Sequence, residues 1–334
     1  MALHRFLSLC CCIVALAGWA RAEPLHVVTS VTDLADLVHQ VGGDEVRVES
    51  LVRGPQDPHF IEARPTFVRR LHEADVYVEV GLQLEAGWSP TLLQSARNPK
   101  IRPGGAGYID ASRAIAPLEV PTGRVDRSQG DVHPGGNPHY LVDPVNGLRV
   151  ARLLRERLTD LRPEAAERFA ARTAAYEQAL LARLVGETLA AELGTDALLE
   201  AIAADRLDER GAVGGWLGRL VTAQGVAAVQ DHRVWPYFAR RFGIELVAEL
   251  EPRPGIAPTT GHLTRVVALI ERQDVRLLLA SSYFDPRHAR TVAERTGIPV
   301  VILGHQVGAL PGTDDYLSLI ETNVSRVEEA LGDR

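Results

Sequence analysis

The chain has 334 residues, of which 46% are apolar and 24% are charged, and its mean hydropathy is close to zero. These values are typical of a globular protein that is long enough for two domains with hydrophobic cores of their own. Beyond the first 22 residues, 34 basic side chains stand against 43 acidic ones, a net charge of −9. Because no long basic run occurs, we expect no nucleic-acid partner and no attraction to an anionic membrane.

Residues 1–22 form a predicted secretory signal. Arg5 opens a short basic region, an apolar stretch follows, and Ala20-Arg21-Ala22 offers small residues at a cleavage site before Glu23. The apolar stretch is too short for a retained membrane helix. We therefore expect an exported mature chain that begins at Glu23.

All sulfur-containing residues fall inside this predicted signal. Cys10, Cys11 and Cys12 are the three cysteines, and Met1 is the single methionine. The mature chain therefore has no disulfide and no sulfur ligand for a metal. We expect no lipid at Cys10, because the bulky Leu9 precedes it, and predict a freely soluble protein.

Residues 23–160 are predicted to form an α/β lobe. Ser30 and Asp33 have the spacing of a capping box, at the start of a helix that ends at Gly42-Gly43. Buried runs alternate with helical segments in the order β-α-β-α-β, which implies a parallel sheet with helices on both faces. Ligands of such sheets lie outside the carboxyl ends of the strands, where His59 is expected. The predicted strands are residues 25–31, 46–52 and 76–80.

A glycine- and proline-rich segment leads to a second histidine-bearing turn. Residues 121–136 are predicted to be a mobile loop whose His133 could meet a metal early, although a surface loop that happens to hold one histidine is the commoner case. The turn at residues 137–144 presents His139 and then starts a helix, with Asp143 as N-cap and Pro144 at the first helical position.

Residues 161–192 are predicted to be a long helix that links two lobes. Apolar and aromatic side chains recur on one face over about six turns. A rigid connection between two sheet-forming halves explains this length, and the alternative is a helix packed wholly within one lobe. The residues of the face are Phe169, Thr173, Tyr176, Leu180 and Leu184.

Residues 193–334 are predicted to repeat the α/β architecture. Residues 193–216 indicate a helix and a loop, after which strands and helices alternate up to a closing helix at residues 315–331. The predicted fold class is therefore α/β, with two lobes that are each a parallel sheet flanked by helices, joined by one long rigid helix. The expected strands are residues 226–230, 244–250, 275–280 and 300–303.

Four histidines share one topological position. Each lies in a loop or at a helix start just past an element of a sheet, two in each half, which predicts a shared metal site. Four imidazoles at about 2.0–2.1 Å give the closed tetrahedron typical of zinc, and manganese is the weaker candidate because it favours oxygen ligands. A closed site leaves no position for an activated water. The four are His59, His139, His232 and His305.

Beyond this pattern, the mature chain resembles the zinc/manganese solute-binding proteins of bacterial ABC importers, in which a single rigid helix lies between two α/β lobes. The resemblance implies a metal site made by His59, His139, His232 and a fourth residue, which is commonly an aspartate in the family. His305 is the best match to that position here. Asp285 is a reserve ligand, and Asp57 and Glu62 are alternative ligands or neighbours that hold a ligand in place. The motifs that carry the resemblance are Asp57-Pro58-His59 with Glu62, Gly81-Leu82-Gln83-Leu84-Glu85, Asn137-Pro138-His139 with Asp143-Pro144, His232 with Tyr237 and Phe238, and Glu251-Pro252.

The leading hypothesis is a periplasmic zinc receptor, not an enzyme, that passes its ion to an ABC permease as a monomer, with or without a periplasmic metallochaperone. A manganese-selective receptor of the same fold is the first alternative. A secreted metallohydrolase is the second, and it would need an open coordination position and a base such as Glu62 or Asp285. A receptor for a corrinoid or iron-siderophore would need an aromatic-lined cleft, whereas only 5% of residues are aromatic.

Overall fold

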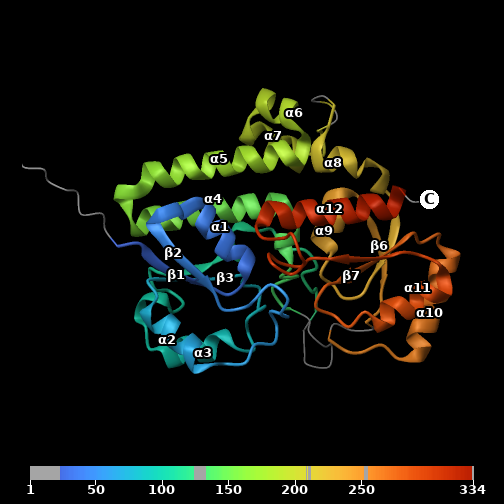
Figure 1. The fold of residues 1–334 in the computed structure, drawn as a ribbon, viewed down its shortest axis with the longest axis horizontal. Coiled ribbons are helices and arrows are strands. Elements are labelled where there is room, and N and C mark those ends of the chain that lie inside the picture. Colours follow the sequence, from blue (N-terminus) through green and yellow to red (C-terminus); the bar gives the residue numbers. More distant parts are fainter. Residues whose placement is uncertain (1–22, 124–132, 208, 210–211, 252–254, 333–334) are drawn as a thin grey trace, which may run out of the picture.

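The computed structural model describes residues 23–123, 133–207, 209, 212–251 and 255–332. The predicted signal and its cysteines lie outside these residues. Two α/β lobes lie side by side, and the helices α4 and α5 run along the first lobe and end near the start of the second (Figure 1). The predicted fold class is confirmed. None of the helices in the described ranges is long and apolar enough to cross a membrane.

The first lobe contains a four-stranded, wholly parallel sheet in the order β2-β1-β3-β4. Its helices α1 and α4 lie on one side of the sheet, and α2 and α3 lie on the other (Figure 1). Both faces are thus buried, which explains the continuous apolar runs in β1 and β3. The elements are β1 (Leu25–Thr29), α1 (Thr32–Gly42), β2 (Val46–Ser50), α2 (Pro65–Glu73), β3 (Val76–Glu79), α3 (Ser89–Ala96), β4 (Tyr108–Asp110) and α4 (Pro144–Leu161).

The second lobe repeats this topology, with the parallel order β6-β5-β7-β8. Equivalent sheets place the carboxyl ends of their strands at equivalent edges, which is the condition for a site shared between lobes. The elements are α8 (Gly215–Arg219), β5 (Ala227–Gln230), α9 (Pro236–Phe242), β6 (Glu245–Glu249), α10 (Thr260–Arg272), β7 (Leu277–Ser281), α11 (Arg287–Thr296), β8 (Val300–Leu303) and α12 (Tyr316–Gly332).

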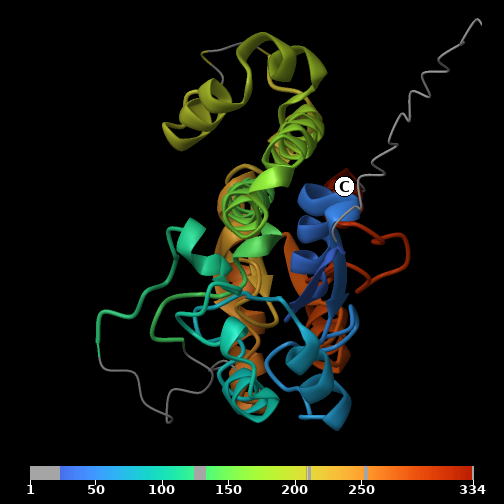
Figure 2. The same ribbon diagram turned by 90° about the vertical axis from the view of Figure 1, so that its left-hand side faces the viewer.

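The predicted linking helix is present as α5 (Ala166–Val185), and its predicted apolar face is buried throughout. Gly186, with φ of 93°, ends α5 and separates it from α6 (Glu187–Leu193). Together with α7 (Thr195–Ala203), α6 stands on the side of α5 that faces away from α4 (Figure 2). The lobe boundaries at residues 160 and 193 stay a prediction.

The predicted capping box at the start of α1 is wrong. Val31 is the N-cap residue and no side chain caps the helix. The Asp33 carboxylate instead accepts a hydrogen bond from the backbone N–H of Val307, 274 positions away, and the Ser30 hydroxyl accepts one from Val80. The Asp33 carboxylate therefore binds a distant backbone N–H group and, contrary to the local sequence pattern, does not cap α1. At α4 the local prediction holds, because the Asp143 side chain accepts from the N–H of Val145 and Pro144 begins the helix.

The two lobes are joined by hydrogen bonds on both sides of the predicted site. The segment after β8 reaches the first lobe, where the Gln306 side-chain amide donates to the carbonyls of Arg53, Gly54 and Gln56. In addition, Asp143, the N-cap residue of α4, forms a bidentate ion pair with Arg241 of α9, with N–O distances of 2.8 and 2.9 Å. The relative position of the lobes is therefore fixed by polar contacts that both lobes contribute.

Candidate metal centre

Three of the four predicted imidazoles come together between the lobes. His59, His139 and His232 each offer a ring nitrogen, and these nitrogens all lie within 4.8 Å of one another. The ring centroids are 5.1 Å apart for the first pair and 6.0 Å for each pair that includes His232. No other group of this kind occurs in the described ranges. The first lobe thus supplies two nitrogens and the second lobe supplies one.

The loop after β2 holds His59 in a single orientation. Oδ1 of Asp57 accepts both the backbone N–H of His59, at 2.9 Å, and its ring Nδ1–H, at 2.8 Å. The indole N–H of Trp88 donates to the carbonyl of Pro58 and fixes the intervening residue. Burial raises the pKa of Asp57, but the hydrogen bonds and charge of His59 outweigh it, so that the pKa lies below its usual value. An ionised Asp57 keeps the proton on Nδ1 and turns Nε2 towards the other imidazoles.

A second carboxylate does the same for His232. The Nδ1–H of His232 donates to Oε2 of Glu251 over 2.6 Å, and the same oxygen accepts the backbone N–H of Gly255 at 2.8 Å. The buried Asp231 carboxylate, which bridges the N–H groups of His232 and Ser281, anchors the start of this loop. Burial raises the pKa of Asp231 to about 6, against the lowering effect of these hydrogen bonds. Paired carboxylate and imidazole groups of this kind orient metal ligands in proteins.

Glu251 belongs to the site through its hydrogen bond to His232, although its sequence motif alone does not predict this role. The sequence signal for this role is the position of Glu251 directly after β6. His232 follows β5 at the same edge of the second sheet, so the two side chains are expected to lie close together.

His139 is held by contacts from the second lobe. Its backbone N–H donates to the side chain of Asn137, while the Tyr237 hydroxyl donates to the Asn137 carbonyl and the Asn137 amide donates to the carbonyl of Arg233. Burial, together with the neighbouring imidazoles of His59 and His232, lowers the pKa of His139 well below its usual value. His139 is therefore neutral at pH 7, which is the form that binds a metal.

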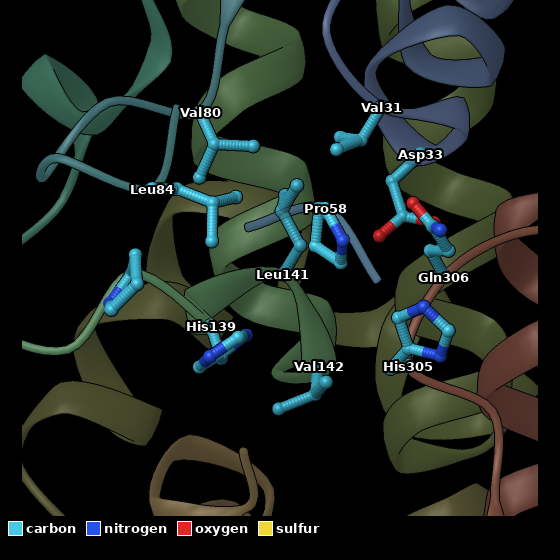
Figure 3. Close-up of a pocket in the computed structure, with 11 residues that line it drawn as sticks. Val31, Asp33, Pro58, Val80, Leu84, His139, Leu141, Val142, His305 and Gln306 are labelled. Atoms are coloured by element: carbon cyan, nitrogen blue, oxygen red, sulfur yellow. The ribbon is translucent and has the colours of Figure 1, made fainter. Parts of the chain in front are cut away.

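The fourth predicted ligand, His305, lies outside the group of three. Its Nε2 is 3.1 Å from the carbonyl of Gln56 and its Nδ1 is 3.2 Å from the Ser282 hydroxyl. Burial lowers the pKa of His305 to about 4. His305 and His139 line different sides of a small cavity of about 30 Å³, with Leu141 and Pro58 between them (Figure 3). Its role as a ligand stays a prediction.

Of the remaining predicted site residues, some contact the three clustered imidazoles and others lie at the surface. The His133 ring stacks on His59 with centroids 5.5 Å apart, and Asp57 orients His59 as described above. Glu62 is exposed. Asp285 is also exposed and accepts hydrogen bonds from the backbone and guanidinium of Arg287, so it faces the start of α11.

The donor chemistry of the site fits a borderline divalent cation. Neutral imidazoles are ligands for zinc, and zinc sites often have three protein nitrogens and a further position. Manganese and magnesium favour carboxylate, carbonyl or water oxygens. The two nearest carboxylates, Asp57 and Glu251, are engaged by ring N–H groups and support imidazole ligands.

A protein-family model described as "Zinc-uptake complex component A periplasmic" matches residues 27–190 and 212–330. The matched parts contain all three clustered histidines and both sheets. They leave out residues 191–211, which include α7.

Two curated proteins are similar over nearly the whole chain. The zinc-binding lipoprotein AdcA of Streptococcus pneumoniae serotype 4 is 23% identical over 332 residues, which cover 96% of this chain and 59% of AdcA. The chain thus spans about three fifths of that relative. The manganese ABC transporter substrate-binding lipoprotein PsaA of Streptococcus pneumoniae is 23% identical, with 97% of this chain and 94% of PsaA covered.

Solved structures share the fold. A crystal structure of ZnuA superposes with a TM-score of 0.67 at 21% identity and covers 92% of this chain and 100% of that chain. The Mn-bound periplasmic metal binding protein from Candidatus Liberibacter asiaticus has the same TM-score at 17% identity, covering 92% of this chain and 99% of that one. At these identities the likeness concerns the fold alone.

Proposed function

The chain belongs to the zinc-uptake complex component A family, and from this premise we propose that it is a periplasmic receptor that captures Zn²⁺ between its lobes and delivers it to the permease of an ABC importer. It acts as a binding protein and not as an enzyme. The observation that carries the proposal is the convergence of three imidazole nitrogens from both lobes within 4.8 Å.

Zinc is favoured over manganese by the donor set. The relatives with assigned metals include both a zinc-binding and a manganese-binding lipoprotein, so the family alone leaves the ion open. In this chain, both carboxylates closest to the imidazoles accept hydrogen bonds from imidazole N–H groups. A manganese site would need such oxygens as ligands, whereas a zinc site uses the imidazoles and leaves the carboxylates as their partners.

A metallohydrolase is disfavoured by the surroundings of the three nitrogens. Such an enzyme needs a free general base next to the open position. Glu62 is exposed, Asp285 pairs with Arg287, and Asp57 and Glu251 are held by imidazoles. The cavity beside His139 is also too small for a corrinoid or a siderophore, because its volume is only about 30 Å³.

Capture between lobes also accounts for delivery. Because both lobes supply ligands, separation of the lobes would divide the ligand set and release the ion. The partner is the permease subunit, which is driven by an ATPase. We infer export from the predicted signal at residues 1–22 and propose that the receptor acts as a monomer, with or without a periplasmic metallochaperone.

The test is zinc titration of the purified protein against a chromophoric competitor. We expect one Zn²⁺ per chain, tighter binding of Zn²⁺ than of Mn²⁺, and no hydrolytic turnover. His139→Ala should weaken zinc binding severely with unchanged circular dichroism, while His39→Ala, an exposed imidazole of α1, is the matched control. Equal affinity in the His139→Ala variant and the parent would refute the site.

A further inference from the structure

A fourth imidazole lies against the site from outside the two sheets. The His133 ring stacks on His59 at an interplanar angle of 28°, and the centroid separation of 5.5 Å falls within the 5.1–6.0 Å range of the three clustered rings. Rings that share one metal ion have spacings of this order, because the nitrogens of a tetrahedral site all lie about 2.0–2.1 Å from the centre. The His133 ring is thus as close to His59 as the clustered rings are to one another, although in its present orientation its nitrogens do not belong to the set within 4.8 Å.

The backbone next to His133 is held in place by the first lobe. The side-chain carbonyl of Gln83 accepts the N–H of Gly135 at 2.9 Å, and the N–H of Gly136 donates back to the His133 carbonyl. Leu82 and Gln83 themselves have φ of 51° and 66°. Left-handed conformations are costly for residues with a side chain and persist where the surrounding structure imposes them, often at functional sites. This strained turn presents Gln83 to the segment that carries His133.

The competing candidates are engaged elsewhere. His305 has a hydrogen-bond partner at both ring nitrogens, one of which is the carbonyl of Gln56 in the opposite lobe. That contact connects the lobes, and metal binding at Nε2 would break it. Asp285 is paired with Arg287 at the surface.

We propose that His133 is the fourth ligand of the metal centre and that Gln83 is the residue that positions it. This inference rests on the proposed function. A rotation of the His133 side chain brings a nitrogen to the ion while Gly135 stays bonded to Gln83. The ion is then enclosed by four imidazoles, one of which is supplied by the segment before the His139 turn, and His305 remains a connection between the lobes.

The test uses Co²⁺ as a spectroscopic substitute and Zn²⁺ for affinity. The ligand-field absorption of the Co²⁺ protein should change in His133→Gly and return to that of the parent when imidazole is added. It should stay unchanged in His305→Gln. The zinc affinity of His133→Ala should fall by more than the roughly 10–100-fold that loss of a supporting hydrogen bond costs. His288→Ala, a histidine of α11 away from the site, is the control.

Gln83→Ala tests the positioning role. It should weaken zinc binding in the parent background but have little further effect in His133→Ala, because the two residues act through one ligand. If the parent binds one Zn²⁺ and His133→Ala has the parent's affinity and Co²⁺ spectrum, the inference is wrong and the proposed function stands. If the parent itself binds no Zn²⁺, both are wrong.

Discussion

Glu251 and His232 are joined by a 2.6 Å hydrogen bond from Nδ1–H to Oε2, although 19 positions separate them. Strand β6 returns the chain to the edge where β5 ended, so that the carboxylate arrives behind the imidazole. Asp57 and His59 form the same pairing within one short loop in the other lobe. Each lobe therefore contains its own carboxylate–imidazole unit.

Removal of the Glu251 carboxylate should weaken metal binding without removing a ligand. Glu251→Ala frees the His232 ring to rotate and to change its protonated nitrogen, and we expect about a 10–100-fold loss of zinc affinity. Competition titration measures it. Glu245→Ala, at the exposed start of β6, is the matched control and should bind like the parent. An unchanged affinity for Glu251→Ala would show that His232 needs no carboxylate.

The ion pair between Arg241 and Asp143 should contribute to stability. Their side chains are 17% and 8% exposed, so Arg241→Ala leaves a nearly buried carboxylate without its partner. We expect a loss of about 3 kcal/mol in the free energy of unfolding, at the lower end of the range for such changes. Arg287→Ala breaks an exposed pair with Asp285 and should change the free energy of unfolding far less, because solvent screens that pair. Urea denaturation of both variants gives the comparison.

Close approach of the lobes depends on a glycine. A Cβ atom on Gly54 would lie 2.2 Å from the carbonyl carbon of Gly308, which belongs to the segment from the other lobe. Gly54→Ala should therefore push the lobes apart, cost roughly 1–3 kcal/mol in stability and reduce zinc affinity. Gly261→Ala, where the nearest atom is 3.9 Å away, is the control and should change neither quantity appreciably. Parent-like zinc binding in Gly54→Ala would contradict the dependence on lobe closure.

His305 should make the metal-free protein less stable in mild acid. Its pKa is about 4 in the folded state and about 6.5 in an unfolded chain, so that between these values the unfolded chain binds more protons. The free energy of unfolding contributed by this group is complete above pH 6.5 and is lost as the pH falls towards 4. His305→Gln should lose less stability between pH 7 and pH 5 than the parent does, as measured by urea denaturation. If the parent and His305→Gln lost the same free energy of unfolding, the pKa of His305 would not be lowered by burial.

Asp33 should have the opposite effect. Burial raises its pKa to about 8, against the hydrogen bond from Val307, while the unfolded value is near 3.8. The folded state binds the extra proton between these values, so stability falls as pH rises towards 8. Asp33→Asn keeps the acceptor for Val307 and should be more stable than the parent by a margin that grows from pH 5 to pH 8 and then levels off, with a limit of about 1.4 kcal/mol per pH unit. Asp44→Asn, at an exposed carboxylate, is the matched control.

Local signals in the sequence predicted those parts of the site that are built from near neighbours. The Asp143-Pro144 helix start and the turn that presents His139 depend on residues within a few positions. The Asp57 and His59 pairing is similarly local. Repeated βαβ order is enough to place His59 and His232 at corresponding edges, because parallel strands end at one edge of their sheet.

The sequence by itself determined the two parallel sheets, the long helix, and three histidines at positions from which they could meet. Only the tertiary structure decided that His305 turns to the Gln56 carbonyl, 249 positions away, that Asp33 binds Val307 and does not cap its helix, and that Glu251 supports His232. The reason is that hydrophobic periodicity and turn chemistry act over a few residues, whereas the direction of a buried polar side chain is set by whichever partner the packing of the two lobes brings within hydrogen-bonding distance.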